Sequence, residues 1–149
     1  MQSNNYKNFF LSLLASLIVM YVVMFLNVVD FGHIYFSLTR LYMVLLMVSP
    51  MALLMLFFMR KMYTNKKVNL FIGLASVFVF VLSLLFLRYQ VFISEAQYMK
   101  AMIPHHSSAI LTSQKADLSD SEVKKLSEDI IEAQEREIEQ MKQILKSLD

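Results

Sequence analysis

Leu41-Tyr-Met-Val-Leu-Leu-Met-Val-Ser-Pro-Met-Ala-Leu-Leu-Met-Leu-Phe-Phe-Met59 is a stretch without a single charged side chain. A helix needs about 20 apolar residues to cross a hydrocarbon core roughly 30 Å thick. Similar uncharged stretches lie on either side of it, at Phe9 to Val29 and Val68 to Leu87. We therefore predict three transmembrane helices, over 9–29, 41–59 and 68–87, with the lipid bilayer as their surroundings.

The charges divide the chain into two parts. Up to Leu87 the only acid is Asp30, whereas the basic residues there are Lys7, Arg40, Arg60, Lys61, Lys66 and Lys67. The rest of the chain has a small excess of acids and a pattern typical of soluble helices. We predict a transmembrane region over 1–88 and a polar helical region over 89–149. The whole is expected to be an all-α membrane protein.

The two connectors between the predicted spans differ in charge. Arg60 to Lys67 contains four cations and no acid, while Asp30 to Arg40 contains one of each. The positive-inside rule therefore places the second connector in the cytoplasm. This orientation puts the N-terminus inside and the C-terminal region outside, and we predict a bacterial cytoplasmic (inner) membrane. The first span is too long for the apolar core of a signal peptide, so we expect it to remain in the protein.

Two helices are predicted beyond the spans, over about 94–116 and from Ser119 onward. The break near Asp117 and Leu118 is short, so the helices should form an antiparallel hairpin. Ser119 and Glu122 fit a capping box at the start of the second helix. One face of that helix is predicted to comprise Val123, Leu126, Ile130, Gln134, Glu137, Met141, Ile144 and Leu148.

Soft metal ligands gather on the first helix of this hairpin. Met99, Met102 and His106 share one side, His105 lies at its edge, and Pro104 is expected to kink the helix. The chain contains no Cys, which excludes thiolate sites, disulfides and Cys nucleophiles. Thioethers and imidazoles without thiolate favour Cu(I), or Ag(I), over zinc and magnesium.

The second helix should supply partners to this cluster. Counting outward from the break places Met102 level with Gln134 and Met99 level with Glu137, with Met141 one turn further. Met141 is therefore a fifth candidate ligand. Glu137 and Gln134 are predicted to support the site from outside, Glu137 by accepting a hydrogen bond that orients an imidazole.

The run Met102-Ile-Pro-His-His-Ser-Ser-Ala-Ile110, followed by Leu126, Ile130, Gln134, Glu137 and Met141 in register, resembles the DUF305 family. The resemblance covers about residues 94–146. It implies a ferritin-like helical fold, of which this hairpin would be half of a four-helix bundle. It also implies extracytoplasmic copper or silver binding linked to metal tolerance, as in periplasmic proteins of the CopM type. Thr112 stands where family members often have another Met.

A second methionine pattern lies inside the predicted membrane region. Every fourth residue of the second span is a thioether, which would form a slowly turning row. These residues are Met43, Met47, Met51, Met55 and Met59. Met packs well as a flexible apolar residue, so ordinary helix packing is the favoured interpretation of the row and a copper-handling feature is the alternative.

Three functions remain open from the sequence. The leading one is a membrane-anchored protein that sequesters Cu(I) or passes it to a copper-handling partner. A structural or regulatory membrane subunit, whose hairpin only mediates assembly, is the alternative. A di-iron oxidoreductase would need Glu-x-x-His pairs, which are absent. Because no nucleophile motif or nucleotide fingerprint occurs, we predict no enzymatic activity and no nucleic-acid partner. A lone hairpin has a small core, so a homodimer or higher oligomer is expected.

Overall fold

The computed structural model describes residues 2–148, and among these residues every regular element is a helix. The chain divides into two compact units. One comprises Met1–Val23 with Thr39–Phe92, and the other comprises Met24–Leu38 with Ile93–Asp149. Each unit is therefore assembled from two separate segments of the chain. The all-helical prediction is confirmed.

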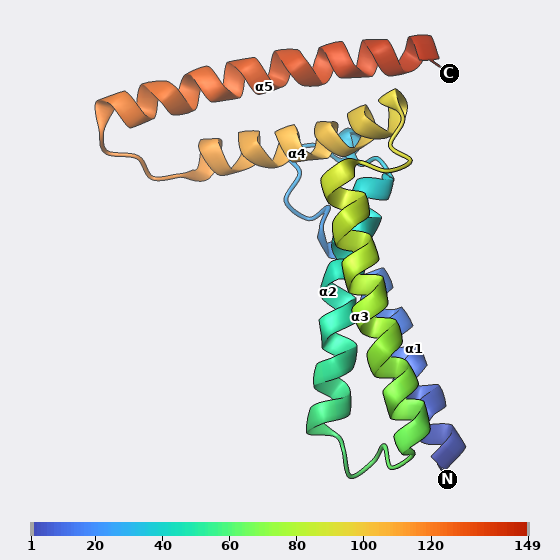
Figure 1. The fold of residues 1–149 in the computed structure, drawn as a ribbon. Coiled ribbons are helices and arrows are strands. Elements are labelled where there is room, and N and C mark those ends of the chain that lie inside the picture. The colour runs from blue at the N-terminus through green and yellow to red at the C-terminus, as the bar shows by residue number, and fades with distance from the viewer. Residues whose placement is uncertain (1, 149) are drawn as a thin grey trace. The chain divides into compact units, whose positions relative to one another are not determined.

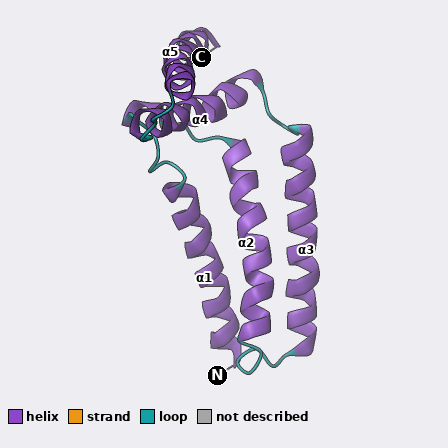
Figure 2. Cartoon of the chain, turned by 90° about the vertical axis from the view of Figure 1, so that its left-hand side faces the viewer, coloured by secondary structure: helices purple, strands orange, loops and turns teal. Residues whose placement is uncertain are grey.

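Three long apolar helices form the first unit: α1 (Gln2–Val23), α2 (Leu38–Phe58) and α3 (Lys66–Tyr89). They run side by side in both views of the chain (Figures 1 and 2). Each has the length and composition to cross a membrane, yet only 6%, 28% and 17% of their most apolar windows are buried inside the protein. So much exposed apolar surface is far more than a soluble monomer carries. This exposure fits helices that face lipid.

Side chains near the start of α1 pack against the connector between α2 and α3. Phe9 is fully buried in a cluster with Ala52, Tyr63 and Ile72. The Tyr6 hydroxyl donates to Asn69 Oδ1 at 2.8 Å. Asn65 caps α3 by accepting from the amides of Lys67 and Val68. The N-terminal part of α1 and the 59–65 connector are thus joined at one end of the unit.

The first helix differs from its predicted span. It begins before Phe9 and ends at Val23, whereas the span was predicted to continue to Val29. Residues beyond Val23 belong instead to the second unit, where the Asn27 side chain donates to Ser108 Oγ at 2.6 Å and the Val29 amide donates to Ser107 Oγ at 2.9 Å. These bonds between distant residues replace the last helical turn, and apolarity alone did not reveal them.

The second unit contains the predicted hairpin, α4 (Glu95–Lys115) and α5 (Ser121–Leu148). Ser94 caps α4 by accepting from the Gln97 amide. Gln90 ends α3 in the left-handed conformation and Phe92 has φ 59°, so α3 and α4 are separate helices. Pro104 lies within α4 and is fully buried. The core between the helices is formed by Met99, Ile103, Ile110, Ile138 and Leu145.

The start of α5 corrects the predicted capping box. Asp120, rather than Ser119, accepts from the amides of Glu122 and Val123 at 2.9 and 3.0 Å. A carboxylate accepts both amides and also interacts favourably with the positive end of the helix dipole. Asp120 therefore acts as the N-cap, and the helix begins at Ser121.

Replacing Asp120 with Ala should destabilise the hairpin by about 1 kcal/mol, because two amides of the first turn lose their acceptor. Hydrogen exchange at the amides of Glu122 and Val123 would measure this loss locally. Ser119→Ala is the matched control and should leave both amides protected. An equal loss of amide protection in the two variants would contradict this assignment and support Ser119 as the cap.

The face of α5 that packs on α4 also differs from the prediction. The face is centred on Ser127, Ile131, Gln134, Ile138, Met141 and Leu145, and Ala133, Glu137 and Lys142 beside it are half-buried. Val123, Leu126, Ile130, Ile144 and Leu148, which were predicted to face inward, are exposed. Both sets repeat at steps of three and four, so periodicity permits either face to be the buried one. The side chains of α4 decide between them.

A cover over the hairpin comes from the connector between α1 and α2. This segment, Met24 to Leu38, includes the short helix η1 (Phe31–His33), which lies against α4. Tyr35 packs on the hairpin core, and the Leu38 amide donates to Gln97 Oε1 at 2.9 Å. Figure 2 shows this loop in teal beside α4. The hairpin therefore has a third packing element, whereas the sequence predicted only the two helices.

Candidate metal centre

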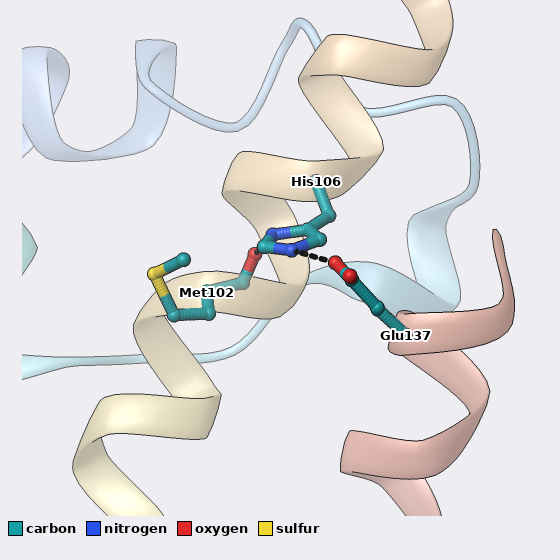
Figure 3. A network of polar contacts seen from close by, with 3 residues as sticks. All are labelled: Met102, His106 and Glu137. Carbon is teal, nitrogen blue, oxygen red and sulfur yellow. Dashed lines mark hydrogen bonds and ion pairs between the residues drawn. The ribbon is translucent and has the colours of Figure 1, made fainter. Parts of the chain in front are cut away.

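His106 is held between the two helices of the hairpin. Its side chain is largely buried, and both of its ring nitrogens have partners. Nδ1 lies 2.9 Å from the carbonyl oxygen of Met102, one turn earlier on α4. Nε2 lies 2.8 Å from Oε2 of Glu137 on α5 (Figure 3). The imidazole thus bridges α4 and α5 with its orientation fixed.

These contacts define where the protons lie. A carbonyl oxygen only accepts, so Nδ1 must carry a hydrogen and donate it to Met102. One more proton occupies the contact between Nε2 and Glu137, carried by the imidazole as an ion pair or by the carboxyl group as a neutral pair. If Glu137 moves away and that proton leaves, Nε2 presents a free lone pair. The Glu137 side chain is 44% exposed, so it can turn away from His106 into solvent.

Met99 and Met141 lie together further along the hairpin. Met99 is buried in the core, and Met141 packs against the same cluster. Both line an open groove of about 520 Å³ with Tyr98, Glu95 and Ile144 among its walls. The sequence placed Met99 level with Glu137, so the true register is one turn further along α5. The cause is the non-helical segment 116–120, which is longer than the predicted break.

The remaining candidates occupy less enclosed positions. His105 is exposed, with its ring centroid 5.9 Å from that of His106. Met102 and Gln134 are half-buried. In Figure 3 the Met102 sulfur lies on the side of the His106 ring away from Glu137. Within residues 2–148, no three His, Asp or Glu side chains converge as a metal-binding group. The five candidate ligands thus form two neighbouring groups: Met102, His105 and His106, and Met99 with Met141.

The methionine row of α2 does not keep to one environment. Met43, Met51 and Met55 are half-buried, and Met55 packs beside the Phe9 cluster. Met47 and Met59 are exposed on the outside of the helices. A repeat of four residues advances about 40° per step on a helix with 3.6 residues per turn, so the row turns out of the interior.

His33 and Ser107 form a buried contact that the sequence analysis missed. The His33 Nδ1 atom lies 2.9 Å from Ser107 Oγ, which also accepts from the Val29 amide. Burial lowers the pKa of His33, nearby Lys142 lowers it further, and Asp30 opposes both. The neutral imidazole can accept the Ser107 hydroxyl hydrogen through Nδ1. The available signal was a pair of small polar residues, Ser107 and Ser108, directly after the two histidines.

Two comparisons with known proteins found similar sequences. A family profile described as a domain of unknown function, DUF305, matches residues 89–148. An uncharacterized protein of Acanthamoeba polyphaga mimivirus is 37% identical over 116 residues, which cover 76% of this chain and 74% of the viral protein. No solved structure matches the chain significantly.

Proposed function

Because this chain belongs to the DUF305 family through its residues 89–148, we propose that it is a membrane-anchored protein that binds Cu(I) or Ag(I) outside the cytoplasm. Its role would be copper sequestration, transfer to a copper-handling protein, or tolerance. The observation that carries the proposal is the environment of the His106 imidazole. Its Nδ1 atom donates a hydrogen bond to the Met102 carbonyl, and its Nε2 atom contacts Glu137, a partly exposed side chain that a metal ion could displace.

Fixing Nδ1 by hydrogen bonding is how proteins prepare a histidine to ligate through Nε2. The Met102 carbonyl would supply that bond, a role we first predicted for Glu137. Glu137 instead competes with a metal for Nε2. A soft ion such as Cu(I) prefers imidazole and thioether to carboxylate, so it would displace Glu137 rather than bind it. Met102 and exposed His105 are the nearest further ligands, and Met99 with Met141 offers a second pair of thioethers.

The anchor is supported by the exposed apolar helices and by the pattern of contacts between loops. Three spans place the N-terminus and the 59–65 connector on one side of a membrane, and the Met24 to Leu38 connector and the hairpin on the other. Side-chain contacts within each of these pairs support this arrangement: Asn5 with Met62, and Asn27 with Ser108. The positive Arg60 to Lys67 connector favours the cytoplasm, which would leave the hairpin outside. The bacterial inner membrane stays a prediction, and the viral relative widens the choice of membranes.

A structural or regulatory subunit is the second candidate function. The specific observation in its favour is that both His106 nitrogens already have protein partners. In that case the imidazole would serve only to brace α4 against α5. Metal analysis of the detergent-purified full-length protein, under reducing conditions with Cu, Ag and Zn competing, separates the two functions. Stoichiometric Cu(I) or Ag(I) supports the first, and none supports the second.

Replacing both Met99 and Met102 by Leu should weaken Cu(I) binding at least about tenfold, or about 1.4 kcal/mol. Leu preserves the apolar volume but removes the thioether, so the helices should remain folded. Competition against a Cu(I) chelator measures the change. The double variant Met47→Leu and Met59→Leu, on the exposed side of α2, is the control. Unchanged competition in the first variant would remove Met99 and Met102 from the site.

A further inference from the structure

Helix α5 carries a second apolar row beside the one that packs on α4. We define the outer row as Val123, Leu126, Ile130, Ala133, Glu137, Gln140 and Ile144. Its members follow strict steps of three and four residues, the repeat of a helix that packs along another helix. Leu126 is 59% exposed, and Val123 and Ile144 are each about half exposed. The row extends for about 32 Å along the helix. Ala133 and Glu137 at its centre are half-buried, and Glu137 contacts His106 of α4, whereas the other members are exposed.

We propose that the outer row binds the outer row of a second copy of this chain, with the two α5 helices antiparallel about a two-fold axis. A two-fold contact joins the same surface on both copies, so the row must complement itself. About an axis near Glu132, Ile130 meets Ala133 of the second copy, Leu126 meets its Glu137, and Val123 meets its Gln140. The small Ala133 side chain permits close approach at the centre.

The charges beside the outer row select this direction. Asp129 and Arg136 are exposed on the same edge of the row, each one residue before a row position. Asp129 lies about two and a half residues on one side of the proposed axis and Arg136 about four and a half on the other, an offset of about 3 Å along the helices that the long Arg136 side chain can span. In the antiparallel pair, Asp129 of each copy therefore faces Arg136 of the other, so that the complementary contact occurs twice. In a parallel pair, the Asp129 and Arg136 edge of one copy would instead lie opposite the other edge of the second copy. That other edge consists of Gln134 and Met141, which face α4 and offer no opposite charge.

A second copy suits the outer row better than a membrane surface does. Glu137 and Gln140 interrupt the row, and burying polar and charged side chains against lipid is costly. Glu122 and Asp129 along its edge would also be repelled by anionic headgroups. Between two copies, Glu137 keeps the His106 partner that it already has at 2.8 Å. Leu126 of the second copy would then cover this pair, so assembly would reduce the access of water to the candidate metal centre.

Cysteine cross-linking tests the direction, because the chain contains no Cys of its own. Full-length Val123→Cys and Gln140→Cys proteins, mixed in detergent without added metal, should form a disulfide with each other upon oxidation. Lys125→Cys, on the charged side of α5, replaces Val123→Cys as the control and should not cross-link. Efficient cross-linking of Val123→Cys with itself would show a parallel pair and overturn the proposal, and so would no cross-linking at all.

Charge reversal tests the pairing itself. Asp129→Arg and Arg136→Asp should each weaken dimerisation by about tenfold, because each places two like charges face to face across the axis. The double variant should restore it, since the pairs are then only inverted. Light scattering of the metal-free protein reports the dimer, so this result is independent of copper binding. Failure of the double variant to restore the dimer would overturn the contact, as would lipid quenching of a fluorophore attached at Val123→Cys.

Discussion

His106→Gln should lower the affinity for Cu(I) on the order of 100-fold, about 2.7 kcal/mol, whereas Glu137→Ala should leave it unchanged or raise it. Gln can still hydrogen-bond to Met102 or Glu137 but offers no soft nitrogen ligand. Removing the Glu137 carboxylate frees Nε2 of His106 from its 2.8 Å contact. The two variants change the two partners of the same contact, and yet they should act in opposite directions on copper binding.

Chelator competition with Cu(I) on full-length protein measures both variants, and helix content by circular dichroism shows whether each is folded. If His106 and Glu137 only brace the two helices, both variants should lower stability equally and neither should alter copper binding. A loss of affinity in Glu137→Ala as large as in His106→Gln would show that the carboxylate belongs to the metal site. Our first interpretation, in which Glu137 orients the imidazole, would then return.

Ser107→Ala should release the Met24 to Leu38 connector from the hairpin. The Ser107 side chain is fully buried, and its removal leaves the Val29 amide and the His33 imidazole without their partner. An unsatisfied buried group costs about 1 to 3 kcal/mol, and the partly buried Val29 amide should fall at the lower end of this range. Together they should reduce hydrogen-exchange protection at the Val29 amide by about 30- to 1,000-fold, or about 2 to 4 kcal/mol.

Ser108→Ala is the control for this variant, because the Ser108 hydroxyl bonds to the exposed Asn27 side chain and not to the Val29 amide. It should change Val29 protection little. Unaltered protection in Ser107→Ala would mean that the connector is held by Tyr35 and Gln97 and does not require the serine contact.

The helices were predictable from the sequence because their signals are local. Long uncharged stretches located the three apolar helices, and Ser94 and the 117–118 break located the hairpin within a few residues. The sequence could not decide a structural feature where two sets of residues give the same local signal. Ser119 and Asp120 are both good caps, and α5 has two rows with the same period. Contacts between distant residues decide each of these cases.

The candidate site was predictable to a similar degree. A contact of Glu137 with an imidazole was predicted from the hairpin and from the misfit of an acid on an apolar face, but the sequence did not choose between His105 and His106, and the structure shows His106. The Met102 carbonyl could not be predicted, because a backbone acceptor has no sequence signature. The contribution of His33 was missed for a different reason. Its partner Ser107 lies 74 residues away, across two apolar helices, and neither residue is unusual in its own segment.

The connector between α1 and α2 is synthesised early, but the α4 residues that it contacts, Ser107 and Ser108, are synthesised much later. Asn27 and Ser108 are 81 residues apart, so at roughly 5 to 20 residues per second the ribosome needs about 4 to 16 s to deliver the second after the first. During that interval the Val29 amide and His33 have only water as a partner. The connector can therefore form these contacts only after the hairpin has been synthesised, although it leaves the ribosome long before the hairpin. A hairpin expressed without residues 24–38 would lack this cover and expose Ser107 and Met99 to solvent.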